Sequence, residues 1–382
     1  MDIFKDIKYV GVNDHEIDLF EGQYVVPNGM AYNSYVIMDD KIAIVDSVDA
    51  RFANEWLANV KAVLSDHSPD YLIVQHMEPD HSGSITAFCN AYPTAKIVAS
   101  TKAFGMMKNF FKADYSDRGV PIKDGATLNL GSHSLTFIEA PMVHWPEVVM
   151  TYDQTSKVLF SADAFGKFGA KGTDENWSCE ARRYYIGIVG KYGQPVQNLF
   201  KKLSGIELNA ICPLHGEILC DNISYYLGLY DTWSSYRIES EGVVIAYTSI
   251  YGNTKKAAFK LKDLLENLGT KVAISDLARC DMAEAVEDAF RYGKIVFATT
   301  TYNGEIFPFM REFINHLVER NFQNRTVAFI ENGSWAPNAT KIMQSMLEKC
   351  KNLTFVGNVK IMSSLSDENN LELSNLADQL SK

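Results

Sequence analysis

The chain has 382 residues, 47% of them hydrophobic, and a formal net charge of −11 at pH 7. A chain of this length exceeds what one hydrophobic core usually supports, so we expect two domains. The acidic balance argues against nucleic acid or an anionic membrane as a partner, because either would require a basic face. No apolar stretch reaches the ~20 residues that span a bilayer, and the first residues lack a secretion-signal pattern, which predicts a cytoplasmic protein. The six cysteines form no C-x-x-C pair, so free thiols are expected.

The first 240 residues show short apolar strands separated by turns and by helical patterns. Strands are expected at residues 35–38, 42–45, 71–74, 96–99, 135–138 and 157–160. Helices are expected at residues 53–64 and 194–203. This mixture of strands and helices predicts an α/β sandwich.

A dense cluster of titratable side chains follows the strand predicted at residues 71–74. It consists of His76, Glu78, Asp80 and His81. Alternate residues of an extended chain face the same side, so the first three project together. Because such groups seldom cluster without pairing or binding a ligand, the motif predicts a metal site, with enough ligands for two metals. A polar loop that happens to be rich in titratable residues is the alternative.

Three further candidate ligands each lie just past a predicted strand. They are His144, Asp163 and His215. The ends of neighbouring strands converge on one rim of a sheet, which would bring these residues to the motif. Taken alone, either histidine would be read as an ordinary core or loop residue. The other histidines are expected at the surface or in helix caps: His15, His67, His133 and His316.

The polar segment 234–242 is expected to be a linker between domains 1–240 and 241–382. After it, strands and helices alternate regularly. Strands are expected at residues 243–247, 271–275, 295–298, 326–330 and near 355–359, and helices at 254–268, 282–292, 309–320, 339–349 and from 367. Five such units predict a doubly wound parallel sheet.

Three polar loops of this second domain follow predicted strands. The first opens into a helix, where backbone N–H groups and hydroxyls bind a phosphate without Lys or Arg. This suits flavin mononucleotide (FMN), with the aromatic side chains of the later loops against its ring system. Since no G-x-G-x-x-G follows a strand, a dinucleotide is disfavoured. Taken alone, the first loop could be an N-capping turn. The loops contain Thr248, Ser249, Ile250, Tyr251, Gly252, Asn253 and Thr254; Thr300, Thr301, Tyr302, Asn303 and Gly304; and Asn332, Gly333, Ser334 and Trp335.

The pattern H-x-E-x-D-H, followed by H, D and H, resembles that of the flavodiiron proteins. The local matches are His144-Trp145-Pro146 and Pro213-Leu214-His215-Gly216. The resemblance implies a metallo-β-lactamase-like αβ/βα sandwich followed by a flavodoxin-like domain. It also implies that His76, Glu78 and His144 bind one iron, that Asp80, His81 and His215 bind the other, and that Asp163 bridges them. In some members the residue that matches His81 is not a ligand.

Two further residues come from this resemblance. Tyr192 matches a family tyrosine that can donate a hydrogen bond near the irons, and Trp145 could wall the pocket. Glu78 stands where a hydrolytic zinc relative would carry His, and this exchange gives a harder, more anionic site that suits iron.

The resemblance implies an oxidoreductase that passes electrons from an external donor through FMN to the diiron site, which reduces O2 to water, NO to N2O, or both. It implies a head-to-tail homodimer or a dimer of dimers. No cysteine-ligated iron module follows residue 382, so the donor is expected to be a separate molecule, rubredoxin or a reduced deazaflavin.

Three alternatives remain: a zinc hydrolase, a flavodoxin-like electron carrier without enzymatic activity, and a diiron and FMN gas sensor. The choice between O2 and NO also stays open, because it depends on the geometry around the metal ligands and on the flavin–iron spacing. In addition, Pro27-Asn28-Gly29-Met30 occupies a stretch where some relatives place a histidine near the gas pocket.

Overall fold

The computed structural model describes residues 2–382. The chain folds as two compact units. The first comprises the chain up to Tyr185 together with Gln194–Asp231, and the second comprises Ile186–Gly193 together with Thr232–Lys382. Residues 2–382 contain no helix that is both long enough and apolar enough to cross a bilayer.

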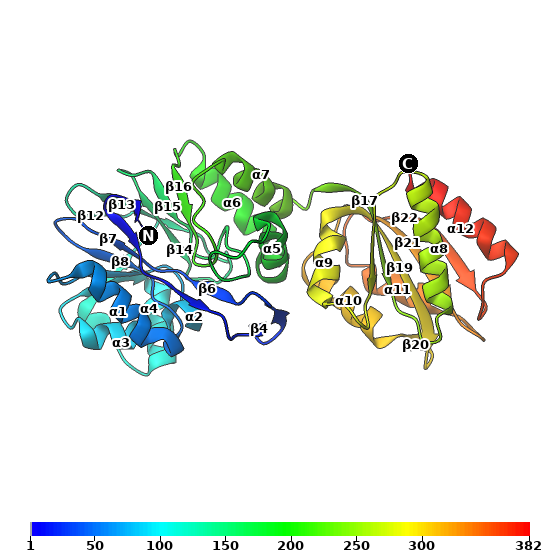
Figure 1. Ribbon diagram of the computed structural model, residues 1–382, viewed down its shortest axis with the longest axis horizontal. Coiled ribbons are helices and arrows are strands. Elements are labelled where there is room, and N and C mark those ends of the chain that lie inside the picture. The colour runs from blue at the N-terminus through cyan, green and yellow to red at the C-terminus, as the bar shows by residue number, and fades with distance from the viewer. Residues whose placement is uncertain (1) are drawn as a thin grey trace. The chain divides into compact units, whose positions relative to one another are not determined.

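The first unit is a sandwich of two β-sheets (Figure 1). The larger sheet has the order β1 (Asp2–Phe4), β2 (Ile7–Tyr9), β7 (Tyr35–Ile37), β8 (Ala43–Val45), β9 (Tyr71–Val74), β10 (Lys96–Ser100) and β11 (Gly119–Ile122). The smaller sheet has the order β12 (Thr127–Asn129), β13 (Ser134–Glu139), β14 (Val149–Asp153), β15 (Val158–Phe160) and β16 (Ala210–Cys212). Two short ladders complete the strands: β3 (Val12–Asp14) with β6 (Met30–Tyr32), and β4 (Leu19–Phe20) with β5 (Tyr24–Val25).

The core of this unit lies between the two sheets. Val45 and Ile73 of the larger sheet share one buried cluster with Phe137 and Phe160 of the smaller sheet, and each is at most 1% exposed. Burying a side chain of this size stabilises the fold by about 1.5–3 kcal/mol. Strand β8 is buried along its whole length because its outer face is covered as well.

Helices cover the outer faces of the sandwich, with α1, α3 and α4 on one side and α6 and α7 on the other (Figure 1). In helix α1, for example, the apolar residues Trp56, Val60 and Leu64 recur every four residues and form the buried stripe of the helix. The helices of this part of the chain are η1 (Ala50–Phe52), α1 (Ala53–Leu64), α2 (Pro79–Ser82), α3 (Ile85–Ala91), α4 (Thr101–Phe111), η2 (Ser116–Arg118), α5 (Trp177–Tyr184), η3 (Tyr185–Val189), η4 (Gly190–Tyr192), α6 (Gly193–Leu203) and α7 (Ile223–Ser234).

The second unit is a parallel sheet with helices on both faces. Its strand order is β18 (Val272–Asp276), β17 (Ser240–Tyr247), β19 (Tyr292–Tyr302), β21 (Thr326–Asn332) and β22 (Thr354–Ile361), and β20 (Glu305–Ile306) pairs with β19. Helices α8 (Asn253–Asn267) and α12 (Asp367–Leu380) lie on one side, and α9 (Met282–Arg291) and α10 (Pro308–Glu319) on the other, with α11 (Ala339–Leu347) packed on α10 (Figure 1). The order 2-1-3-4-5 is that of flavodoxin. The predicted fold class is therefore confirmed for both parts of the chain.

Candidate functional site

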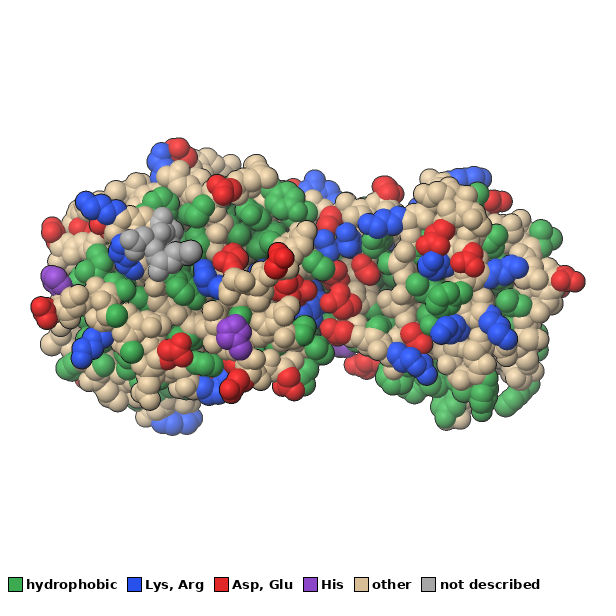
Figure 2. All heavy atoms as spheres, in the orientation of Figure 1, with side chains coloured by type: hydrophobic (Ala, Val, Ile, Leu, Met, Phe, Trp, Pro, Cys, Tyr) green, Lys and Arg blue, Asp and Glu red, His purple; other side chains and the backbone are tan. Residues whose placement is uncertain are grey.

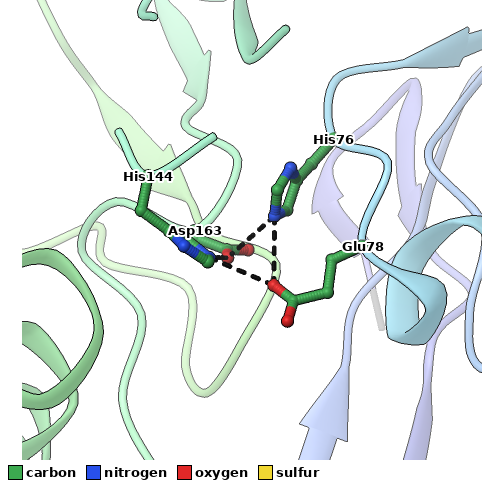
Figure 3. Close-up of side chains that lie close together, drawn as sticks. All are labelled: His76, Glu78, His144 and Asp163. Atoms are coloured by element: carbon green, nitrogen blue, oxygen red, sulfur yellow. Dashed lines mark hydrogen bonds and ion pairs between the residues drawn. The ribbon is translucent and has the colours of Figure 1, made fainter. Parts of the chain in front are cut away.

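Four of the seven predicted metal ligands form one compact group at the rim of the sandwich (Figure 3). His76 and Glu78 come from the loop that follows β9, while His144 lies between β13 and β14 and Asp163 follows β15. A hydrogen bond of 3.0 Å from the Val149 amide to the Gln75 carbonyl joins the His76 loop to the start of β14. One ligand atom from each of the four residues lies within 4.8 Å of the others.

The other three predicted ligands form a second group, again with ligand atoms within 4.8 Å of one another. Asp80 and His81 lie in the short helix α2, and His215 follows β16. The Nε2 atoms of His81 and His215 are 3.0 Å apart, and the Asp80 carboxylate lies 3.3 Å from the first and 3.4 Å from the second.

Asp163 lies between the two groups. Its Oδ2 is 3.0 Å from Nε2 of His144 and 3.4 Å from Nε2 of His76. Its Oδ1 is 3.2 Å from Nε2 of His81. Each carboxylate oxygen thus faces one group, which is the arrangement that a bridging carboxylate requires.

The spacing of these atoms fits metal ions. Ligand atoms about 2.1 Å from a metal and at right angles to one another are about 3.0 Å apart, since typical metal–nitrogen distances are ~2.0–2.1 Å. Nε2 of His144 is 3.1 Å from the Glu78 carboxylate, and Nε2 of His76 is 3.2 Å from it. Both carboxylate oxygens of Asp80 and one of Asp163 are buried without a hydrogen-bond partner among the described residues. Such orphaned acceptors are expected where cations bind.

The pKa shifts of the candidate ligands also support the binding of cations. Burial opposes ionisation of Glu78, but the hydrogen bonds from His144 and His76 outweigh it and hold the pKa of Glu78 below its usual range. Burial also disfavours the charged form of His144, but hydrogen bonds to Asp163 and Glu78 raise its pKa to about 9. Burial and the neighbouring carboxylates raise the pKa of Asp80 to about 7. Imidazolium protons therefore balance crowded carboxylates here, and bound cations would replace those protons.

Partners outside the seven residues orient the imidazoles. Nδ1 of His76 is 2.9 Å from Oε1 of Glu147, which also accepts a hydrogen bond from the Met77 amide. Nδ1 of His215 is 2.8 Å from the Ala31 carbonyl. These contacts leave both Nε2 atoms for a metal. Glu147 escapes prediction from sequence, because a single acid near a histidine carries no spacing pattern.

Asn33 holds the loop that carries His215. Its side-chain Nδ2 donates to the carbonyls of Pro213 (2.8 Å) and Gly216 (2.9 Å), and its backbone amide donates to the Leu214 carbonyl (2.8 Å). The asparagine is fully buried. It therefore spans the whole turn around His215, and nothing in its local sequence suggested this role.

Aromatic rings wall the site. The Trp145 ring lies 5.2 Å from the His76 ring in an edge-on arrangement, so the structure places this predicted residue at the pocket. Tyr192 lies in η4, which belongs to the second unit, and it stays a prediction from the family resemblance.

Tyr184 takes a position that the sequence did not reveal. It is fully buried, its ring is 5.4 Å from the His215 ring, and its hydroxyl has no hydrogen-bond partner among the described residues. Burial, followed by the charges of Asp163 and Glu78, raises its pKa well above the usual value. The hydroxyl therefore keeps its proton.

The hairpin of β4 and β5 also reaches the site. The Phe20 ring lies 5.4 Å from the His215 ring, edge-on. The next residue, Glu21, has a left-handed backbone (φ 49°) and an exposed side chain, and partial desolvation together with the Glu78 carboxylate raises its pKa to about 7. A second carboxyl group, partly protonated near neutral pH, thus lies beside Glu78.

The three loops of the second unit line one cavity of about 540 Å³. Two predicted residues, Thr248 and Gly252, do not line the cavity. The Thr248 hydroxyl lies 2.6 Å from the hydroxyl of Thr299. Gly252 is the N-cap of α8 and has a left-handed backbone with a φ of 87°. The cavity is lined by Ser249, Ile250, Tyr251, Asn253, Thr254, Thr300, Thr301, Tyr302, Asn303, Gly304, Asn332, Gly333, Ser334 and Trp335, and by three residues that were not predicted, Ala336, Asn338 and Ser363.

The chemistry of this cavity fits FMN. Thr254 Oγ1, Thr300 Oγ1 and Asn338 Oδ1 are buried and have no hydrogen-bond partner among the described residues. The first lies at the start of α8, where a phosphate is stabilised by free backbone N–H groups. Tyr251 and Trp335 are 92% and 81% exposed, which leaves their rings free to stack on a flavin.

Known proteins show the same pair of domains. A family model described as "ODP family beta lactamase" matches residues 30–216, and one described as "Flavodoxin domain" matches residues 244–360. A nitric oxide reductase of Moorella thermoacetica is 31% identical, over 90% of this chain and 88% of that protein. An anaerobic nitric oxide reductase flavorubredoxin of Salmonella arizonae is 27% identical, over 90% of this chain and 74% of the relative.

Solved structures agree. Rubredoxin oxygen:oxidoreductase from Desulfovibrio gigas superposes with a TM-score of 0.92 at 25% identity and covers 100% of this chain and 97% of its own. The flavodiiron protein from Giardia intestinalis shares the fold, with a TM-score of 0.87 at 24% identity, over 100% of this chain and 95% of its own. With a 31% identical relative that covers most of it, and with both domains matched, the chain belongs to the flavodiiron protein family.

Proposed function

We propose that this chain is an FMN-dependent diiron reductase of NO, O2 or both. The observation that carries the proposal is the presence in one chain of two groups that together hold seven potential metal ligands and of a cavity lined by the three polar loops. The relatives are named for the same reactions. Neither a zinc hydrolase nor a simple flavodoxin-like carrier uses both sites, and no observation favours a sensor.

The residues of the metal centre have distinct tasks. His76, Glu78 and His144 would hold one iron, Asp80, His81 and His215 the other, and Asp163 would face both, as its two oxygens do in the structure. When bound, the iron pair supplies the electrons and the open positions at which a small oxidant is reduced. The position of Nε2 of His81, 3.0 Å from that of His215, supports it as a ligand.

The surrounding residues control water and protons. Trp145 and Phe20 cover His76 and His215 and restrict the access of water. The Tyr184 hydroxyl, protonated and without another partner among the described residues, can donate a hydrogen bond at this wall. Reduction of O2 to water or of NO to N2O consumes protons as well as electrons, so a protonated group at the wall suits either reaction.

The partners follow from the position of the two cofactors in separate units. We propose a head-to-tail homodimer, or a dimer of dimers, in which the flavin of one subunit serves the irons of the other. We propose rubredoxin as the external donor, supported by the name of the Desulfovibrio gigas enzyme and by the flavorubredoxins, with a reduced deazaflavin as the alternative. We also propose a cytoplasmic location.

The test uses the protein loaded with FMN and iron. It is reduced photochemically without oxygen and then mixed with NO or O2 while flavin absorbance and products are followed. Reoxidation by at least one gas should be much faster than that of free FMN, and Asp163→Asn should lose this rate while retaining FMN. If neither gas reoxidises the protein faster than free flavin, the assignment fails.

A further inference from the structure

Helix α8 carries a group of lysines that starts at the flavin cavity. The helix contains Lys255, Lys256, Lys260 and Lys262, and its first residues, Asn253 and Thr254, line the cavity. Lys262 forms an ion pair of 2.6 Å with Glu266. Within residues 2–382, no carboxylate lies within 4.0 Å of the other three ammonium groups. Figure 2 shows Lys and Arg side chains over this part of the unit.

The lysines of α8 contrast with the charge balance of the domain that contains them. Residues 241–382 hold 16 of the 36 Lys and Arg residues and 17 of the 47 Asp and Glu residues, so the second domain is nearly neutral while the first carries most of the negative charge. The lysines of α8 therefore form a local positive surface on a domain with almost no net charge. A local surface of this kind creates a field that attracts an oppositely charged partner.

The lysines are placed where a helix tolerates them poorly. Lys255 and Lys256 lie in the first turn, which contains no acidic residue, and cations are unfavourable at this end of the helix dipole. Lys256 and Lys260 are four residues apart, a spacing at which like charges repel. By contrast, α12 of the same unit begins with a capping box and two acidic residues. The positions of Lys255, Lys256 and Lys260 therefore do not serve the stability of the helix.

The FMN phosphate does not account for these lysines. Neither Lys255 nor Lys256 lines the cavity. Nζ of Lys255 lies 5.5 Å from the centre of the Phe259 ring, one turn further along the helix and away from the phosphate loop. Phe259 is itself 39% exposed. Lys255, Lys256, Phe259 and Lys260 thus make an outward surface with an apolar centre, which we call the α8 lysine face.

We propose that the α8 lysine face docks an acidic electron-carrier protein that reduces the FMN. The inference rests on the proposed function, because it assigns a place to the external donor. Electron-transfer partners meet through small interfaces, often below ~1,200 Å², so that charge attraction rather than buried area sets their rate of encounter. The face begins at Lys255, the residue after the cavity-lining Thr254, so a carrier bound there would lie beside the flavin.

The test follows flavin reduction alone, in the absence of either gas. The FMN-loaded protein is mixed without oxygen with a reduced acidic rubredoxin, and the second-order rate constant for loss of flavin absorbance is measured by stopped flow. The triple variant Lys255→Glu, Lys256→Glu, Lys260→Glu should lower this constant at least ~10-fold at low ionic strength. In the unchanged protein the constant should fall as salt is added, and in the variant this dependence should disappear or reverse.

A matched control changes three exposed lysines near the amino ends of the strands, whereas the cavity lies at the carboxyl ends. These are Lys271, which precedes β18, and Lys349 and Lys351, which lie between α11 and β22. Their replacement by Glu changes the net charge equally and should alter the rate constant by less than ~3-fold.

Three results would overturn the proposal. The first is an equal loss in both triple variants, which would show an effect of net charge alone. The second is a weaker affinity for FMN with an unchanged rate constant, which would assign the lysines to the phosphate. The third is a constant in the unchanged protein that does not depend on salt. Because no gas is present, failure of the gas-reductase assignment would leave these readings unaffected.

Discussion

Replacement of Asn33 by alanine should loosen the turn that carries His215. The change removes the donor to the buried carbonyls of Gly216 and Pro213. The Pro213 carbonyl keeps a second hydrogen bond of 2.7 Å from the Tyr35 hydroxyl, whereas the Gly216 carbonyl loses the partner described for it. The half-buried Tyr9 hydroxyl, which donates to Oδ1 of Asn33 at 3.0 Å, also loses its acceptor. An orphaned buried carbonyl costs about 1–3 kcal/mol and a weakened one about 0.5–1 kcal/mol, which together predict a loss of about 1.5–4 kcal/mol.

The measurement combines denaturant unfolding of the metal-free protein with iron titration. The first unit should unfold at a lower denaturant concentration, and affinity for iron at the Asp80, His81 and His215 group should fall roughly 10–100-fold. Asn59→Ala is the control, because Nδ2 of Asn59 makes only long contacts of 3.4 and 3.3 Å. A stability loss no larger than that of the control, together with unchanged iron affinity, would refute the reasoning.

Three other perturbations test other parts of the structure. Glu147→Gln should weaken iron binding about 10–100-fold in a metal titration, because it alters the acceptor that orients His76, and unchanged binding would contradict this role. His133 is buried rather than at the surface, and its hydrogen bond to Asp153 raises its pKa although burial opposes the charged form. The pair therefore stabilises the fold below about pH 6.5 and loses this effect as pH rises through the higher folded value. The difference in unfolding midpoint between the unchanged protein and His133→Gln should shrink from pH 6 to 9, and a constant difference would argue against it. Thr254→Val should raise the Kd of FMN about 10-fold but leave riboflavin, which lacks the phosphate, unaffected, and equal losses for both would show a general change of the cavity.

The elements of the second domain could be predicted closely from the sequence. The helix expected at residues 282–292 corresponds to α9, Met282–Arg291, and the strand expected at 326–330 to β21, Thr326–Asn332. Apart from the two-residue β20, each strand there is long enough to show an apolar run, and helices such as α9 show a period of 3.6 residues. Strands β3 to β6 of the first domain have only two or three residues each, too few for either pattern.

The residues of the candidate site also divide into those that could be predicted from the sequence and those that could not. The seven candidate ligands could be predicted because four of them are adjacent in sequence and the others follow strands. Asn33, Glu147 and Tyr184 could not, because each acts through a contact with a distant segment, as when Asn33 binds carbonyls 180 and 183 residues away. The expected hydrogen-bond donor Tyr192 matched a family pattern, whereas the buried Tyr184 could be found only from the packing of α5 against His215.

The short segment Ile186–Gly193 can complete its contacts only after most of the chain has been synthesised. Its Ile186 carbonyl accepts a hydrogen bond from Nε of Arg320, a residue 134 positions later, and its Lys191 carbonyl accepts one from Asn321. During synthesis the amino-terminal sandwich can close long before these partners leave the ribosome. Until then the segment lacks these two partners, and a protein cut after residue 240 would never acquire them. The two units are therefore not independent in biosynthesis, because the second is completed by residues made before its first strand.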